Sequence, residues 1–121
     1  MKLLFVENHA VFARMAIAQF LSGNEVFVTP SLAGARAALL AGRFDALLVD
    51  FDLDDGKGDQ LVAELRAAGE AVPIVAVSAT QEGNQALLSA GASVVVSKAV
   101  FPQLPAVLAQ LIARAPPGAV R

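Results

Sequence analysis

Cysteine, tryptophan and tyrosine are absent from this chain, and histidine occurs once. The lack of cysteine excludes disulfides, thiolate catalysis and cysteine-based zinc sites, and it is compatible with a reducing compartment. A single histidine excludes a metal site built from several imidazoles. The lack of tryptophan and tyrosine argues against a flavin carrier, because flavin sites normally flank the ring with aromatic side chains.

An excess of basic charge is also missing, since 9 lysines and arginines stand against 11 aspartates and glutamates, for a formal net charge of -2. This balance argues against nucleic acid as the main partner. The apolar run at residues 1–6 ends at Glu7, too early for a secretion signal, and no run approaches membrane-spanning length. We therefore expect a cytoplasmic protein that binds neither nucleic acid nor a membrane.

Apolar residues are plentiful: they make up 56% of the 121 residues, enough to fill the core of one ordinary domain. Short apolar runs alternate with segments of helical spacing. Strands are predicted at residues 2–6, 25–28, 45–49, 73–77 and 93–96, and helices at 9–21, 31–41, 59–68, 81–90 and 103–115. This alternation predicts an α/β domain whose helices cover both faces of a parallel sheet.

The domain is expected over residues 1–114. Residues 115–121, which include Pro116 and Pro117, are predicted to form a tail or the start of a linker. No effector domain is present, so we expect the domain to act alone or to be joined through this tail to another one.

Polar residues follow four of the five predicted strands. Glu7 and Asn8 follow the first, Asp50 the third, Ser78 the fourth and Lys98 the fifth. The carboxyl ends of parallel strands share one edge of a sheet, where α/β proteins bind ligands. A carboxylate there can take up a phosphoryl group if magnesium and a lysine offset the charge on the phosphoryl oxygens. A hydroxyl can hydrogen-bond one of those oxygens.

In these features the chain resembles the receiver domain of two-component response regulators. The resemblance spans residues 2–113, and it is carried by Glu7-Asn8, by residues 46–50 and 72–79, by Gly91-Ala92 and by Ser97-Lys98. It implies a flavodoxin-like, doubly wound five-stranded parallel sheet of order 2-1-3-4-5 with five helices. It also implies a phosphoprotein of a phosphorelay, which is not an enzyme beyond its own phosphorylation and dephosphorylation.

The resemblance implies roles for individual residues. Asp50 matches the phosphoacceptor, Ser78 the hydroxyl that follows the phosphoryl group during activation, and Lys98 the lysine that pairs with that group. The expected donor is a histidine kinase or a phosphotransfer protein. The signal is expected to change the conformation of the domain and to reach a homodimer or effector partner through residues 81–90, 93–96 and 103–113.

Magnesium is the implied cofactor, with Glu7, Asn8, Asp50 and Asp52 as its expected ligands. Asn8 stands where the family usually has a second acid, and magnesium sites favour carboxylates. Asp52 adds a carboxylate that many members lack, which could offset that loss. We therefore expect weak magnesium binding.

Two further positions depart from the family pattern. Ala99 follows Lys98 where the family usually has a proline joined by a cis bond, and a non-proline cis bond costs about 3–4 kcal/mol. Either this bond is trans, which would shift Lys98, or the fold holds it cis under strain. Val95 occupies the position of the switch aromatic, so a ring cannot turn inward here and the signal must leave by another element.

Two alternatives remain open from the sequence. A receiver that has lost phosphorylation could serve as a protein-interaction module, which Asn8, Ala99 and Val95 favour. A small phosphohydrolase could pair Asp50 with Asp52 as nucleophile and second acid. Phosphorylation by a small phosphodonor separates the first alternative from the receiver, and turnover of a phosphoester would support the second.

Overall fold

A computed structural model of the chain describes residues 1–114, and the predicted tail lies outside the described residues. One sheet has five strands, all paired in parallel, in the order β2-β1-β3-β6-β7. They are β1 (Lys2–Val6), β2 (Glu25–Thr29), β3 (Ala46–Val49), β6 (Ile74–Ala76) and β7 (Val94–Val95). The predicted doubly wound sheet of order 2-1-3-4-5 is therefore confirmed.

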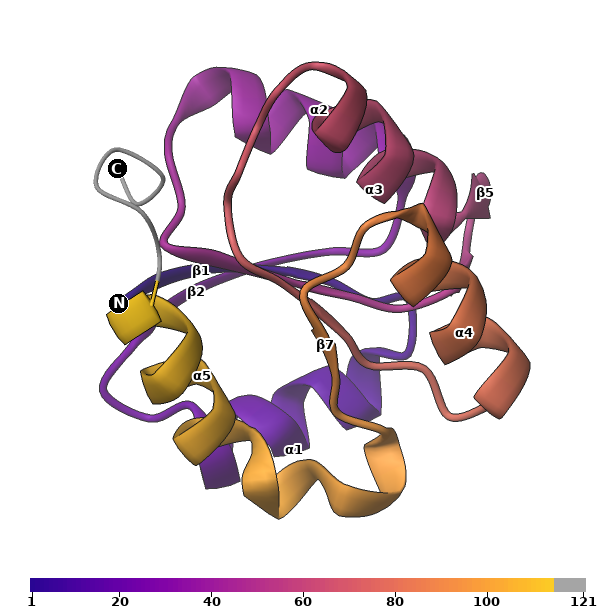
Figure 1. The fold of residues 1–121 in the computed structure, drawn as a ribbon. Helices are drawn as coiled ribbons and strands as arrows, with labels where there is room; N and C mark the ends of the chain where they lie inside the picture. The colour runs from indigo at the N-terminus through magenta and orange to yellow at the C-terminus, as the bar shows by residue number, and fades with distance from the viewer. Residues whose placement is uncertain (115–121) are drawn as a thin grey trace.

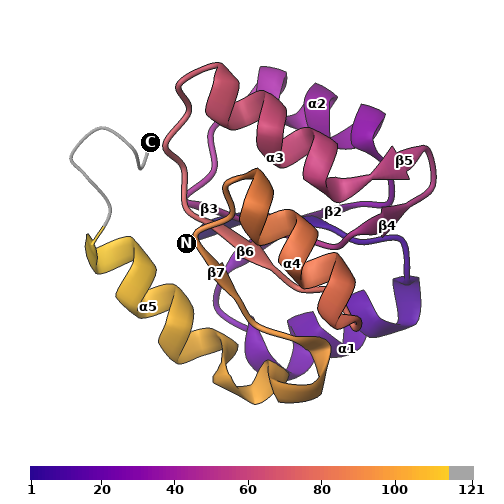
Figure 2. The same cartoon turned by 45° about the vertical axis from the view of Figure 1, so that its right-hand side comes forward.

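Five α-helices cover the two faces of this sheet. They are α1 (Ala10–Phe20), α2 (Leu32–Ala41), α3 (Gly58–Ala67), α4 (Gln81–Ala90) and α5 (Leu104–Arg114). Helices α1 and α5 lie on one face, and α2, α3 and α4 lie on the other (Figures 1 and 2). Within residues 1–114, no helix combines the length and the apolar character needed to cross a membrane.

The core has two halves, one on each side of the central strands. Leu4 and Leu47 pack toward α2, α3 and α4, whereas Phe5 and Leu48 pack toward α1 and α5. All four side chains are fully buried, because both faces of a doubly wound sheet are covered. This explains why the strands are continuous apolar runs and do not alternate apolar with polar residues.

Polar caps begin three of the helices. Ser31 Oγ accepts a hydrogen bond from the backbone N–H of Gly34 at 2.9 Å, and Thr80 Oγ1 accepts one from Gly83 at 3.1 Å. His9 caps α1 in the same way, with Nδ1 accepting from Phe12 at 3.2 Å. Each cap satisfies an N–H that has no partner inside its helix.

Two short structural features were not predicted from the sequence. An antiparallel hairpin, β4 (Asp52–Leu53) with β5 (Gly56–Lys57), follows β3, and a 3-10 helix, η1 (Lys98–Gln103), precedes α5. The tip of the hairpin is an exposed turn, but Asp55 in it accepts hydrogen bonds from the N–H groups of Leu32 and Ala33 at 2.6 and 3.0 Å. The hairpin is thereby attached to the beginning of α2.

Candidate functional site

Three charged side chains meet at the carboxyl edge of the sheet. The Lys98 ammonium lies 2.9 Å from Glu7 Oε1 and 3.2 Å from Asp50 Oδ2. The side chains of Lys98, Glu7 and Asp50 are only 18%, 0% and 9% exposed. One cation therefore bridges two carboxylates in a place from which water is almost excluded, and we call these three side chains the edge cluster.

The register of the sheet brings the edge cluster together. Val6 on β1 pairs with Val49 on β3, so the next residues along these strands, Glu7 and Asp50, emerge side by side. The N–H of Asp50 donates to the carbonyl of Val6 at 3.0 Å, and that of Lys98 donates to the carbonyl of Ser78 at 3.4 Å. Backbone hydrogen bonds therefore hold these strand ends together, independently of the side-chain contacts.

Two backbone N–H groups orient the carboxylates of the edge cluster. The N–H of Phe51 donates to Asp50 Oδ1 at 2.8 Å, and the N–H of His9 donates to Glu7 Oε2 at 3.1 Å. The other oxygen of each carboxylate faces the Lys98 ammonium. Glu7 Oε1 takes no hydrogen bond within residues 1–114, despite its ion-pair distance to Lys98. It is a buried acceptor with capacity for a further partner.

The balance of charge in the edge cluster is unusual. The pKa of Glu7 is raised from 4.5 to about 7, chiefly by burial; the nearby Lys98 ammonium opposes this shift and the charge of Asp50 adds to it. Desolvation disfavours a charged carboxyl, and one ammonium cannot neutralise two carboxylates. The site therefore holds either a proton or an unmatched negative charge near neutral pH.

Ser78 is buried at the tip of the next strand. Its backbone is held by Asn84 on α4, whose Oδ1 accepts from Ser78 N–H at 2.8 Å and whose Nδ2 donates to Ser78 O at 2.9 Å. Ser78 Oγ accepts from the N–H of Thr80 at 3.2 Å. Thr80 caps α4 and Ser78 does not. Asn84, itself 6% exposed, gave no signal in the sequence, because only the tertiary fold places it opposite a strand end.

Two glycines allow close approaches around Asp50. A Cβ on Gly58 would lie 1.9 Å from the Asp50 carbonyl oxygen, so no side chain fits there. A Cβ on Gly83 would lie 2.5 Å from Ser78 Oγ and 3.0 Å from Phe51 Cβ. The hydroxyl of Ser78 and the residue after Asp50 therefore flank the same point in space. Neither glycine could be expected at the site from the sequence.

The other two predicted metal ligands lie at the surface of the domain. Asn8 is exposed, and the carboxylate of Asp52, whose side chain is 66% exposed, forms an ion pair with Lys57. Within residues 1–114, no group of three acidic or histidine side chains is arranged to hold a metal ion. Glu7 and Asp50 nevertheless fit magnesium, which often binds through one or two carboxylates and keeps several waters. Glu7 Oε1, which contacts the Lys98 ammonium but takes no hydrogen bond, is suited to such a role.

The bond between Lys98 and Ala99 is trans. Lys98 still reaches both carboxylates, and its ammonium lies 4.6 Å from the centre of the Phe12 ring. A cation over an aromatic face is attracted by the electron density of the ring. The trans bond is thus compatible with a lysine that faces Asp50.

Val95 is half-buried on the edge strand β7, beside a cavity of about 390 Å³. Thr80, Asn84 and Ser97 are among the residues that line this cavity. Valine has no ring to fill it, and no side chain of the described chain occupies it.

The doubly wound sheet of five parallel strands is the fold expected of a receiver domain. The model of the response regulator receiver domain matches residues 3–109, and the chain belongs to this family. Receiver domains are signalling domains of two-component systems, in which they work with kinases or phosphotransfer proteins.

Known proteins similar to this chain are also of this class. The swarming motility regulation protein RssB of Serratia marcescens is 34% identical over 80 residues, which are 65% of this chain but 36% of that protein. The chain therefore spans well under half of the length of that relative.

Two solved structures extend the likeness. The receiver domain of the sensor histidine kinase PA1611 from Pseudomonas aeruginosa PAO1 is 28% identical with a TM-score of 0.83, and it carries a magnesium ion in its active site cleft. The receiver domain of the Francisella response regulator 1452 is 20% identical with a TM-score of 0.82, a likeness of fold alone. In both comparisons the match covers 93% of this chain and 97% of the other.

Proposed function

We propose that residues 1–114 form a receiver domain that accepts a phosphoryl group on Asp50. The observation that carries the proposal is the 3.2 Å contact between Lys98 Nζ and Asp50 Oδ2. In the transfer, a carboxylate oxygen of Asp50 forms a bond to phosphorus while the bond from phosphorus to the donor's histidine nitrogen breaks. Water later attacks the same phosphorus, and the carboxylate of Asp50 leaves, which resets the domain.

Lys98 and Ser78 assist this transfer by charge and by hydrogen bonding. The Lys98 ammonium can follow the phosphoryl oxygens as negative charge moves from the carboxylate to the phosphate. Ser78 Oγ, which flanks the same point as Phe51, can donate its hydroxyl proton to a phosphoryl oxygen. Ser78 Oγ accepts from the N–H of Thr80 at 3.2 Å and lies 3.3 Å from the Thr80 hydroxyl, so donation to a phosphoryl oxygen would replace the contact between the two hydroxyls.

Magnesium would be held by Glu7 and Asp50, and when bound it would neutralise charge on the transferred group. Binding would be weak, because Asn8 offers no charge and the carboxylate of Asp52 is paired with Lys57. A magnesium titration of the wild type against Asp52→Ala tests the second point. Identical curves would remove Asp52 from the site, and a loss of affinity would restore it as a ligand.

The partner that supplies the phosphoryl group would be a histidine kinase or a phosphotransfer protein of the cytoplasm. The face formed by α4, β7 and α5 would receive an effector or a second copy. These assignments follow from membership of the family, and the lack of cysteine is compatible with them.

The decisive experiment is incubation with acetyl phosphate and magnesium, followed by intact-mass spectrometry. We expect a mass increase of one phosphoryl group in the wild type and none in Asp50→Asn. Asp52→Asn is the matched control, because it removes a neighbouring carboxylate that lies outside the edge cluster. An unmodified wild type, or modification of Asp50→Asn, would contradict the proposal.

An interaction module without phosphorylation is the second candidate. It is favoured by the small set of acidic groups at the edge, where the described residues bring only Glu7 and Asp50 to Lys98. An unmodified wild type that still binds its partner would support it. The phosphohydrolase alternative needs Asp52 beside Asp50, and the pairing of Asp52 with Lys57 gives it no support.

A further inference from the structure

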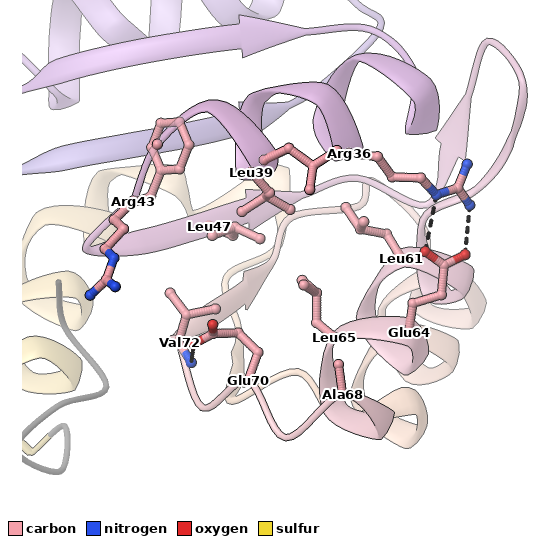
Figure 3. Close-up of a pocket in the computed structure, with 13 residues that line it drawn as sticks. Arg36, Leu39, Arg43, Leu47, Leu61, Glu64, Leu65, Ala68, Glu70 and Val72 are labelled. Atoms are coloured by element: carbon pink, nitrogen blue, oxygen red, sulfur yellow. Dashed lines mark hydrogen bonds and ion pairs between the residues drawn. The ribbon is translucent and has the colours of Figure 1, made fainter.

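A groove of about 710 Å³ lies between α2 and α3, away from the edge cluster (Figure 3). Its lining includes Phe44 and Val72, which precede β3 and β6, so it opens at the amino edge of the sheet. Leu39, Leu61 and Leu65 supply apolar walls. Phosphoryl transfer at Asp50 makes no use of this groove.

Leu40 lies at the edge of the groove, and 90% of its surface is exposed. A single exposed leucine is ordinary, but one that borders an apolar groove adds to a continuous apolar surface. Such surfaces with a charged rim are typical of protein–protein contacts. The groove therefore has the composition of an interface.

The charges on the rim are segregated by side. Arg36 and Arg43 line the α2 side, and Glu64 and Glu70 line the α3 side. Figure 3 shows the Arg36–Glu64 pair toward one end of the groove and Arg43 with Glu70 away from it. Arg43 and Glu70 are both exposed.

This segregation is self-complementary. If a second copy faces the groove about a two-fold axis that runs along it, α2 of one copy lies on α3 of the other. Arg43 then meets Glu70 of the second copy, and Leu40 meets the apolar wall near Leu65. A two-fold axis across the groove would instead place arginines on arginines. Homodimer contacts with two-fold symmetry require this kind of self-complementarity.

We propose that the groove between α2 and α3 is a homodimer surface, occupied by the α2–α3 face of a second copy of this chain. It is separate from the face formed by α4, β7 and α5. Leu40 anchors the contact, and Arg43 paired with Glu70 of the opposite copy sets its orientation. The proposal does not depend on phosphorylation of Asp50.

Sedimentation velocity of the full chain over a wide concentration range tests this proposal. We expect a dimer in the wild type, and a dissociation constant at least tenfold higher in Leu40→Asp. Val11→Asp is the control, because Val11 is an apolar residue on α1 that is 64% exposed and lies outside both proposed contact faces. A wild type that stays monomeric, or equal losses in the two variants, would overturn the proposal.

Charge reversal tests the orientation. Arg43→Glu and Glu70→Arg should each weaken the dimer, and the double variant should regain most of the affinity. All of these side chains are exposed, so circular dichroism should show folded variants throughout. A double variant weaker than either single one would exclude the predicted pairing.

The absence of cysteine from the natural chain allows a direct readout. A chain with Leu40→Cys, mixed with a chain carrying Ala68→Cys, should form a mixed disulfide dimer under mild oxidation. A mixture of Val11→Cys with Ala68→Cys should not do so at the same rate, because Val11 is exposed on α1, outside the groove. Equal rates would show that the contact is unspecific.

Discussion

Two glutamates in this molecule pair with a cation, and their carboxyl groups behave in opposite ways. Glu7 lies 2.9 Å from the Lys98 ammonium, and its pKa is raised to about 7. Glu64 lies 2.6 Å from Arg36, and its pKa is lowered, chiefly by the hydrogen bond from that arginine. Pairing with a cation therefore does not by itself decide whether the pKa of a carboxyl group is raised or lowered.

Burial makes the difference between the two pairs. The Glu7 side chain is fully buried and faces a second carboxylate, whereas the Glu64 side chain is 50% exposed and has water around it. Removing a carboxylate from water costs more than one shared ammonium returns. A buried set of charges with an excess of one sign is typical of functional sites. An exposed ion pair such as that of Glu64 with Arg36 is an ordinary feature of a protein surface.

The largest effect is expected from Lys98→Met, which leaves two buried carboxylates without a cation. We expect the free energy of unfolding to fall by about 3 kcal/mol at pH 8. The loss should be smaller at pH 5, where Glu7 is protonated. Urea denaturation at both pH values measures it. Lys57→Met, which breaks an exposed pair with Asp52, should cost less than about 1 kcal/mol. Equal losses would mean that burial does not distinguish the two lysines.

Glu7→Gln should stabilise the metal-free protein at pH 8. The folded-state pKa of Glu7 is about 7 and the ordinary value is 4.5, so the folded state holds this proton more tightly than the unfolded chain. The stability from this group is complete below pH 4.5 and is lost as the pH rises through about 7. Removing the charge should therefore recover about 1–3 kcal/mol at pH 8 and little at pH 5.

Urea denaturation of the wild type and Glu7→Gln, with a chelator present, measures this difference. Glu64→Gln is the matched control, because it removes the same charge from an exposed position. A Glu7→Gln variant that is destabilised at pH 8 would show that the ion pair with Lys98 outweighs burial.

The contrast between buried and exposed residues also governs what the sequence could predict. The strands at residues 3–6 and 46–49 were predictable because they are apolar on both faces, and the caps Ser31 and Thr80 because capping is local. Parallel strands end at a common edge, so the meeting of Glu7, Asp50 and Lys98 could be expected.

Contacts made only in the tertiary fold could not be predicted. The two strands of the β4–β5 hairpin have two residues each, too few for any periodicity, and Asp55 attaches the hairpin to α2 across 23 positions. The ion pair of Asp52 with Lys57 depends on that hairpin, so it could not be expected from the sequence. Asn84 and Gly58 likewise depend on distances between elements. The family resemblance supplied the roles of individual residues.

A smaller effect is expected from Asp55→Ala, which removes two hydrogen bonds at the beginning of α2. Hydrogen bonds from Ala33 and Leu32 lower the pKa of Asp55. Its contribution is therefore present above the ordinary value of 3.8 and is lost as the pH falls below it. Thermal melts should show a lower midpoint for Asp55→Ala than for the wild type at pH 7, and this difference should shrink as the pH falls below 3.8. Asp54→Ala, one residue away, is the control and should melt like the wild type.

The smallest effect on stability is expected from breaking the exposed ion pair of Arg36 with Glu64. Arg36→Ala should leave the urea midpoint at pH 7 almost unchanged, because a solvent-exposed ion pair gains little over its hydrated parts. Any loss should vanish in 1 M sodium chloride, where exposed charges are screened. Glu64→Gln should likewise leave the urea midpoint almost unchanged, and any small loss should also vanish in 1 M sodium chloride. A large, salt-independent loss in Arg36→Ala would mean that this pair acts like the buried one, and the distinction between the two regions would fail.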